Sequence, residues 1–262
     1  MTVSDSSGGV RYEVDGARAT ITLDRQETRN ALDAEGLDAV TAALAAAEAD
    51  DTVRVVVLTH AGSVFSSGAD LRAAAGARAE DQPVTRFPAV MQRIWAFPKP
   101  VIGAASGKTR AGGVGLFAVC DLTVCSPASD FATSEVRLGV VPYVISIPFL
   151  ARVPHGAARE WFLTGAVFDG ARAHRDGLVD VLADDVPAAV SSLVDALALG
   201  GPAALTATKA LLRGADTPSS MAERWAALAA QSARTFASPE AQEGIAAMRE
   251  KRPAAWTTGE HA

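Results

Sequence analysis

The feature that most restricts the fold is the segment Val53–Thr59 (VRVVVLT), a run dominated by β-branched residues. Such a run is typical of a strand that is covered on both faces, as in parallel sheets with helices on either side. Val101–Ala105 predicts a second buried strand, and Val10–Val14 and Ala19–Leu23 predict two shorter ones. Between them, the Ala-rich segment Leu32–Ala47 has apolar residues at helical spacing. This alternation of strands and helices predicts an α/β core.

Shorter segments continue the alternation. Leu122–Cys125 and Leu178–Leu182 are expected to be strands, and Ala157–Leu163 is expected to be a helix. Ala73–Gln82 is polar, Ala-rich and weakly patterned, which predicts a mobile loop or a frayed helix.

The sequence becomes almost wholly helical from about Pro187 onward. At Thr217-Pro218 and at Ser238-Pro239, a capping hydroxyl precedes a proline in the first helical position. No linker or low-complexity tract separates this part from the core. We therefore expect residues 1–200 to form the core and residues 201–262 to form a helical C-terminal region.

One face of this helical region carries an apolar stripe. Met221, Trp225 and Leu228 repeat at i, i+4 and i+7, and Phe236 falls near the same face. The spacing predicts a packing face, directed either to the chain's own core or to another subunit.

Composition excludes several classes of protein. With 49% hydrophobic residues in 262, the chain is not intrinsically disordered, and a net charge of −6 without a basic stripe argues against nucleic acid as a partner. No signal peptide and no apolar run of about 18 residues is visible, so we expect a cytoplasmic protein that does not enter a membrane. Cys120 and Cys125 lack metal-ligand spacing with His, which predicts reduced core thiols and no metal site.

Two strand-to-helix junctions carry the candidate chemistry. Ser63–Leu71 follows the first buried strand, and the Gly-rich stretch Gly107–Gly115 follows the second. At the start of a helix the first N–H groups have no partner within the helix and can point at an anion. Two such groups aimed at one carbonyl oxygen would form an oxyanion hole.

Several segments together resemble a known family, the crotonase (enoyl-CoA hydratase/isomerase) superfamily. They occur in the family's order along nearly the whole chain: Asn30–Leu32, Phe65–Leu71, Lys99–Ile102, Ala111–Gly115, Cys120-Asp121, Ser134–Pro142, Leu163–Gly165, Gly177–Val179 and Glu250–Pro253. The resemblance implies a spiral core of repeated ββα units, a helical C-terminal region used in trimerisation, and acyl-CoA thioester substrates. It implies no cofactor beyond the CoA of the substrate, and a homotrimer or a dimer of trimers.

The resemblance also implies roles for individual residues. The oxyanion donors match the backbone N–H groups of Ala69 and Gly112, and the catalytic acid/base matches Glu135. Residues expected to contact the acyl-CoA are Ser67, Gly68, Asp70, Leu71, Arg72, Gly113, Gly115, Pro142, Tyr143 and Lys251. Among them, Arg72 and Lys251 match positions where basic side chains meet CoA phosphates, or they face water. Asp70 and Asp121 are interpreted as structural, and the roles of Lys108 and Arg110 stay open between substrate contact and solvent.

The carboxylates bear on the type of reaction. Typical hydratases of the family have two glutamates, one of which matches Glu135, whereas the other matches Gly115. A single carboxylate could still activate water, or it could move a proton between the α and γ carbons of an enoyl thioester. The string from Glu135 to Pro142 resembles hydratases for branched or glutaconyl-type CoA esters, which favours hydration over isomerisation. Tyr143 stands where that branch has a small residue and could narrow the acyl pocket.

The sequence also bears on two functions from other classes. A CoA-ester-binding pseudoenzyme is possible because one family glutamate is missing. RNA binding, which some relatives perform through a Lys-rich helix, is disfavoured because Leu32–Ala47 contains acidic residues and no Lys or Arg.

Overall fold

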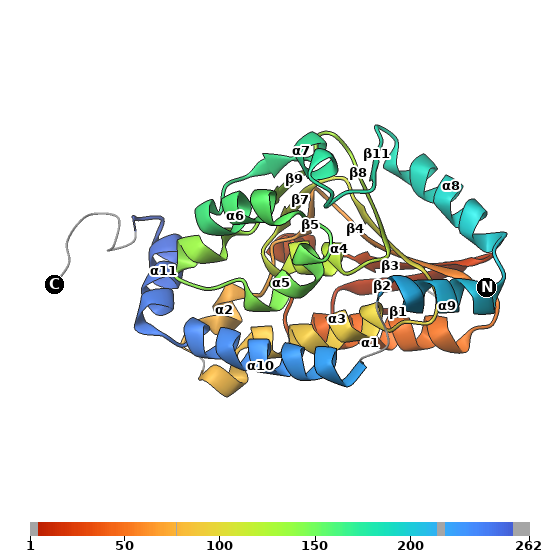
Figure 1. The fold of residues 1–262 in the computed structure, drawn as a ribbon. Coiled ribbons are helices and arrows are strands. Elements are labelled where there is room, and N and C mark those ends of the chain that lie inside the picture. Colours follow the sequence, from red (N-terminus) through yellow and green to blue (C-terminus); the bar gives the residue numbers. More distant parts are fainter. Residues whose placement is uncertain (1–4, 77, 214–217, 254–262) are drawn as a thin grey trace.

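The main layer of the molecule is a seven-stranded sheet (Figure 1). The computed structural model describes residues 5–76, 78–213 and 218–253. The strand order is β1-β2-β3-β4-β6-β8-β11, antiparallel from β1 to β3 and parallel from β3 to β11. The strands are β1 (Asp5–Ser7), β2 (Val10–Asp15), β3 (Arg18–Leu23), β4 (Val55–His60), β6 (Val101–Ala105), β8 (Leu122–Cys125) and β11 (Val181–Leu182).

Both faces of the parallel part are covered, as the run in β4 predicts. Val56 and Leu58 belong to the main core, and Val55 and Val57 pack with β6, β8 and helix α8 (Val186–Ala198) on the other face. Alternate residues of the strand therefore point into two different apolar clusters. This is the physical reason why the run shows no polar alternation.

A second, smaller sheet positions the candidate site. Its order is β10-β9-β7-β5, and β5, β7 and β9 run parallel. These strands are β5 (Val64–Ser66), β7 (Lys108–Arg110), β9 (Asp130–Ala132) and β10 (Phe168–Asp169). β5 and β7 correct the prediction that Ser63–Leu71 and Gly107–Gly115 are only junctions between a strand and a helix, since each segment begins with a short strand of its own.

Three consecutive ββα units connect the two sheets. In each unit a strand of the large sheet (β4, β6 or β8) is followed by a strand of the small sheet (β5, β7 or β9) and then by a helix. The three helices are α2 (Leu71–Ala74), α4 (Gly112–Ala118) and the 3-10 helix η4 (Ser134–Leu138). The repetition confirms the expected α/β spiral of ββα units.

Helices complete the molecule. Those around the core are η1 (Gln26–Thr28), α1 (Ala34–Ala49), η2 (Ala79–Asp81), η3 (Pro83–Arg86), α3 (Phe87–Trp95), α5 (Tyr143–Leu150), α6 (His155–Thr164) and α7 (Gly170–Arg175). After α8 the chain forms α9 (Pro202–Leu212), α10 (Pro218–Phe236) and α11 (Pro239–Glu250), and Figure 1 shows α10 running beside α3. The cap at Ser238 is confirmed, since its side chain accepts from the Ala241 N–H, whereas Thr217 lies outside the described residues.

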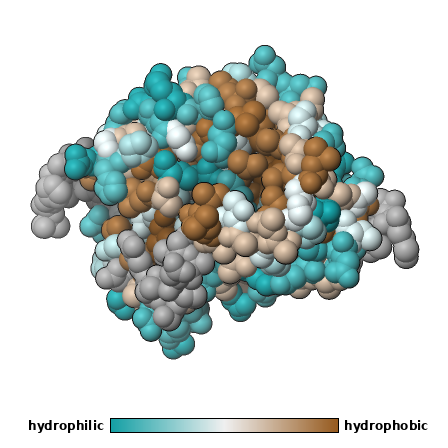
Figure 2. Space-filling view, turned by 45° about the vertical axis from the view of Figure 1, so that its right-hand side comes forward, coloured by the Kyte–Doolittle hydropathy of each residue, from teal (hydrophilic) through white to brown (hydrophobic). Residues whose placement is uncertain are grey.

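The stripe on α10 faces the chain's own core. Trp225 is fully buried and its ring meets that of Trp95 edge-on, and Phe236 is also buried. Leu228 packs against the same cluster, while the side chain of Met221 lies outside the described part. Figure 2 shows separate hydrophobic surface on the side of α8 and α9, where Leu199, Leu211 and Leu212 are among the exposed large apolar residues.

One expectation for local structure was wrong. Leu178 and Val179 are not in a strand, because the N–H groups of both donate to the Ala173 carbonyl at the end of α7, which leaves only Val181–Leu182 to pair with β8.

The segment Ala73–Gln82, expected to be a mobile loop or a frayed helix, contains short helical pieces where it is described. These are the end of α2 and the 3-10 turn η2, and the buried Gln82 amide donates to the Ala74 carbonyl.

No single helix in the described ranges has both the length and the apolar character needed to span a bilayer. α8 and α9 reach that criterion only as a pair, bent by 110°.

Candidate active site

The three ββα units deliver the three predicted catalytic groups to one edge of the small sheet. Ala69 follows β5 by three residues, Gly112 follows β7 by two, and Glu135 follows β9 by three. Because β5, β7 and β9 are parallel neighbours, the segments that leave their carboxyl ends meet at the same edge. Ala69, Gly112 and Glu135 all line one cavity there.

The segment after β5 is clamped by the Asn30–Leu32 motif. Asn30 is 2% exposed, and its amide donates to the carbonyl oxygens of Val64 (2.7 Å) and Ala61 (3.2 Å). The Ser66 hydroxyl donates to the Asn30 carbonyl at 2.8 Å and accepts from the Gly68 N–H at 3.1 Å. These bonds fix the backbone just before Ala69, and they explain why the motif pairs an asparagine with a distant Ser-Gly.

Neighbouring amides in this segment are consumed by other bonds. The Asp70 N–H donates to the Leu32 carbonyl, and the Asp70 carboxylate accepts from the Arg72 N–H as the N-cap of α2. Within the described residues, the N–H of Ala69 has no acceptor. The structural reading of Asp70 is confirmed, and Ala69 is left as the donor available to a ligand.

The segment after β7 is strained at one residue. Ala111 has φ 46° and ψ −119°, a backbone conformation that residues with a side chain rarely adopt. Its N–H donates to the Ala132 carbonyl, and its own carbonyl accepts from Val114 and Gly115. In the part of the chain that is described, the Gly112 N–H has no acceptor. The strain at Ala111 thus sets the direction of the next amide.

The two segments are in contact with each other. A Cβ atom added to Gly68 would lie 3.1 Å from the Gly112 nitrogen and 3.0 Å from the Ala111 Cβ. A Cβ atom added to Gly112 would lie 2.4 Å from the ring of Phe87. A side chain is therefore excluded at both positions. Gly68 lies too close to the backbone of the neighbouring loop, and Gly112 lies too close to the buried ring of Phe87.

Glu135 provides the acidic group of the cavity. It is 7% exposed, and its Oε2 has no hydrogen-bond partner among the described residues. Burial in apolar surroundings raises the pKa of Glu135 to about 7, because desolvation disfavours the charged form. A carboxyl group that titrates near neutral pH in a cavity is a candidate for proton transfer.

The cavity has a volume of about 210 Å³ and is mainly apolar. Its walls come from segments between Arg29 and Met248, including α5 and the C-terminal helices α10 and α11. The lining residues are Arg29, Ser67, Ala69, Leu71, Val84, Phe87, Arg110, Ala111, Gly112, Ser134, Glu135, Leu138, Val140, Val141, Pro142, Tyr143, Val144, Ile145, Ser232, Phe236 and Met248.

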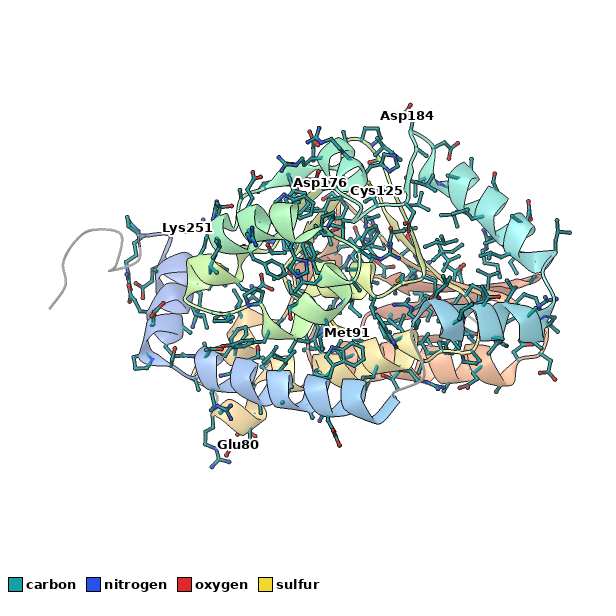
Figure 3. All side chains as sticks on the ribbon, viewed as in Figure 1. Glu80, Met91, Cys125, Asp176, Asp184 and Lys251 are labelled. Carbon is teal, nitrogen blue, oxygen red and sulfur yellow. The ribbon has the colours of Figure 1, made fainter. Side chains whose placement is uncertain are left out.

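Seven of the predicted site residues line this cavity and six do not. Those in the lining are Ser67, Ala69, Leu71, Gly112, Glu135, Pro142 and Tyr143. Those outside it are Gly68, Asp70, Arg72, Gly113, Gly115 and Lys251. Gly68 and Gly113 are packed against neighbouring segments, since a Cβ atom at Gly113 would lie 2.8 Å from that of Ser66. Arg72 and Lys251 are exposed, and Lys251 ends α11 far from the centre of the molecule (Figure 3).

Gly115 does not open a space opposite Glu135. A Cβ atom there would lie 2.5 Å from the Met91 Cε and 2.6 Å from the Ile145 Cγ2. Met91 on α3 (Figure 3) and Ile145 on α5 therefore fill the volume that a second glutamate would need. The expectation that Gly115 contacts the substrate is not supported, because close packing separates it from the cavity.

The remaining charged residues singled out from the sequence are mostly paired. Arg110 lines the cavity, forms an ion pair with Asp130 and donates to the Asp130 carbonyl at 2.9 Å, whereas Lys108 is exposed. Asp121 bonds Lys209 at 2.7 Å and Arg213 at 2.8 Å, which confirms its structural reading. In the described chain no group of three or more His, Cys, Asp or Glu is arranged to hold a metal ion.

Sequence reasoning missed several lining residues. Arg29 directly precedes the Asn30–Leu32 motif, and that position is the one signal that could have found it. Val84, Phe87, Phe236 and Met248 reach the cavity only through long-range packing. They lie on four different elements, η3, α3, α10 and α11, so no local pattern indicates that they share a cavity.

Fold and site together define a class of protein, in which ββα units place backbone amides and one buried acid around a small apolar cavity. The chain matches the family described as enoyl-CoA hydratase/isomerase over residues 13–259. It therefore belongs to the enoyl-CoA hydratase/isomerase family, which confirms the resemblance to crotonases, and it is an enzyme of the hydratase/isomerase kind that acts on acyl-CoA thioesters.

Individual relatives agree with this assignment. A solved enoyl-CoA hydratase from Mycobacterium avium is 38% identical with a TM-score of 0.85, covering 96% of this chain and 100% of its own. An enoyl-CoA hydratase/isomerase from Xanthobacter autotrophicus Py2 is 28% identical with a TM-score of 0.85, covering 97% of each chain. A Thermus thermophilus protein, provisionally named an enoyl-CoA hydratase, is 34% identical over 248 residues, 91% of this chain and 96% of its own.

Proposed function

We propose that the enzyme adds water to, or removes it from, an α,β-unsaturated acyl-CoA thioester, whose carbonyl oxygen is bound by the N–H groups of Ala69 and Gly112. The observation that carries this proposal is the buried carboxyl group of Glu135 in the same cavity as two amides that find no acceptor among the described residues. Two backbone donors at the carbonyl oxygen stabilise the negative charge that develops there as an enolate forms.

Glu135 is the acid/base of the proposed reaction. In the hydration direction, its carboxylate takes a proton from water while the water oxygen bonds to the β carbon and the electron pair of the double bond moves to form the thioester enolate. The same carboxyl group then gives the proton to the α carbon. A pKa of about 7 suits this double role, since the group must both accept and donate a proton near neutral pH.

Isomerisation is the second candidate reaction, and the packing at Gly115 favours it specifically. With Met91 and Ile145 filling that volume, Glu135 is the one carboxylate in the cavity lining of the described chain. It could take a proton from the α carbon of a 3-enoyl thioester and return it to the γ carbon, which moves the double bond. Incubation with 2-enoyl-CoA and 3-enoyl-CoA in parallel, with product analysis, separates the two reactions.

The proposal extends to the two ends of the substrate. The exposed guanidinium of Arg29 at the cavity wall is suited to a CoA phosphate, and Arg72 and Lys251 are further candidates. Aliphatic and aromatic walls and a volume of about 210 Å³ support a short acyl group, and we favour a branched one. Comparing kcat/KM for crotonyl-CoA and a branched enoyl-CoA tests that preference.

The proposed assembly is a homotrimer or a dimer of trimers. The exposed Leu199, Leu211 and Leu212 support self-association, since isolated chains rarely expose several large apolar side chains together. Analytical ultracentrifugation measures the assembly directly.

Glu135→Gln is the test of the catalytic assignment. The substitution keeps the shape of the side chain but removes the base, so kcat should fall about 100-fold or more. The wild-type kcat/KM should rise with pH through about 7 as Glu135 loses its proton, and the variant should lack that limb. Retention of near-normal turnover would remove Glu135 from the mechanism. Complete inactivity of the wild type, with tight CoA-ester binding, would instead identify a binding protein.

A further inference from the structure

The C-terminal helix α11 meets the helix that carries Glu135 through backbone contact. A Cβ atom added to Gly244 of α11 would lie 2.6 Å from the carbonyl oxygen of Leu138, 2.8 Å from its carbonyl carbon and 2.9 Å from its Cα. All three are backbone atoms of η4 or its end, so no side-chain rotation could make room. The absence of a side chain at Gly244 therefore sets how closely α11 approaches η4.

A second glycine completes this contact from the other side. Gly139 ends η4 with φ 68°, and a Cβ atom there would lie 2.9 Å from the Glu240 Cγ and 3.1 Å from its backbone carbonyl carbon. Glu240, Gly244 and Met248 follow one another at intervals of four and share one face of α11. Met248 lines the cavity. One face of α11 thus runs along η4 and ends at the candidate active site.

This contact lies one helical turn from the carboxyl group. Glu135 and Leu138 are three residues apart in the five-residue helix η4, so a shift of Leu138 moves Glu135 as well. The Glu135 carbonyl accepts from the Val140 N–H, but in the described structure nothing bonds its Oε2. The position of the carboxyl group therefore depends on where its helix is held.

We propose that Gly244 is a positioning residue for catalysis. It allows α11 to hold η4 at the distance that keeps Glu135 buried in the cavity and close to the reacting carbons. This inference rests on the proposed role of Glu135 as the acid/base. On this proposal, the C-terminal helix α11 affects catalysis through the position of Glu135.

The groups around Glu135 determine how a shift of η4 would change the pKa of its carboxyl group. The charged and titratable groups nearby are Arg29, Arg110 and Tyr143 in the cavity wall, Arg137 on η4 and Glu240 on α11. Arg110 is paired with Asp130, and the Arg137 side chain donates to the Thr164 carbonyl. The raised pKa of Glu135 comes from loss of water rather than from one of these charges. Displacing η4 and admitting water should therefore lower that pKa.

Gly244→Ala tests the proposal, with Gly156→Ala as the matched control. The added methyl group would push α11 from η4, so kcat should fall about 10- to 100-fold with KM changed less than about threefold. The acid limb of the pH profile should move below about 7. Gly156 lies in helix α6 with nothing within 4 Å of an added Cβ atom, so Gly156→Ala should keep wild-type kcat and the wild-type profile.

The Glu135→Gln background separates this inference from the proposed function. If Gly244 acts through Glu135, adding Gly244→Ala to Glu135→Gln should leave the residual rate unchanged. If Glu135→Gln remains active, the proposed function is overturned. If Glu135→Gln is inactive but Gly244→Ala has normal kcat and a normal pH profile, only the positioning role is overturned.

A milder variant covers the case in which Gly244→Ala does not fold. Glu240→Ala removes the Cγ atom that packs over Gly139, and it should lower kcat in the same direction by about threefold to tenfold. If Gly244→Ala is insoluble and Glu240→Ala keeps wild-type kcat and pH dependence, the proposal is rejected.

Discussion

The amide side and the carboxylate side of the cavity are built in different ways. On the amide side, Ala69 and Gly112 lie two or three residues after strands of the small sheet. The buried amide of Asn30 holds the Ala69 segment, and contact between the two loops holds Gly112 beside it. On the carboxylate side, Glu135 sits on a short 3-10 helix that packs against α6 and α11, and residues of α5, α10 and α11 line the cavity around it. The amide side depends on local backbone geometry, whereas the chemistry of the acid depends on the packing of distant segments around it.

The largest predicted effect sharpens the comparison on the amide side. In Gly112→Ala the new Cβ atom would lie 2.4 Å from the ring of Phe87, which is 1% exposed, so the loop must shift and move its N–H. Loss of one oxyanion donor costs about 100- to 1000-fold in kcat, and we expect the lower end of this range. Steady-state kinetics measures it. The double variant Gly112→Ala/Phe87→Leu should recover part of the loss, and failure to recover any would show that the ring contact is not the cause.

The second prediction concerns the carboxylate side and is a pH effect on stability. The pKa of Glu135 is raised from 4.5 to about 7 in the folded protein, so between these values the folded state binds more protons than the unfolded state. The contribution of Glu135 to stability therefore falls as pH rises through this window and is least favourable above about pH 7. Glu135→Gln removes this cost and should be more stable than the wild type by about 3 kcal/mol at pH 8, with the difference vanishing near pH 4.

Urea unfolding at several pH values, at matched protein concentration, measures this difference. The exposed Glu27→Gln serves as the control and should show no comparable gain at pH 8. Parallel pH dependence of the wild type and Glu135→Gln would mean that the buried carboxyl group carries no such cost.

The third prediction tests whether the space beside Gly115 is closed. Adding one methyl group in Gly115→Ala would force contacts of 2.5 Å with Met91 and 2.6 Å with Ile145. Overpacking of this kind costs about 2 kcal/mol of unfolding free energy. Gly115→Glu should therefore lose stability and activity rather than gain a second catalytic carboxylate. An active and stable Gly115→Glu enzyme with faster hydration of crotonyl-CoA would show that the pocket can open there.

The amide side was the part that could be predicted from sequence. Small residues directly after a buried strand indicate a junction with free N–H groups, so Ala69 and Gly112 followed from local pattern and family resemblance, and both line the cavity. The run in β4 likewise predicts a doubly covered strand because the signal lies within a few residues. Local signals failed where tertiary hydrogen bonds took over, as at Leu178 and Val179, which bond to the end of α7 instead of to a neighbouring strand.

The environment of Glu135 could not be predicted in the same way. Its residue type and position were evident, but the cavity around it is also lined by Phe236 and Met248, which are more than 100 residues away along the chain. Gly115 shows the limit most clearly. From the sequence alone, a glycine in place of a glutamate suggests open space in the structure. Packing between α3, α4 and α5 decides otherwise, because Met91 and Ile145 fill that space.

The smallest predicted effect returns to the amide side, at the strained residue Ala111. With φ 46° and ψ −119°, its backbone costs about 1–3 kcal/mol, part of which glycine would relieve at the expense of about 0.5–1 kcal/mol of chain entropy. Ala111→Gly should therefore raise the unfolding free energy by about 1 kcal/mol, whereas the control Ala46→Gly, on the exposed face of α1, should lower it by about the same amount. Chemical unfolding of both variants resolves the opposite signs. If both lose stability equally, the conformation at Ala111 stores no strain, and the direction of the Gly112 amide must be set by the contact with Gly68 alone.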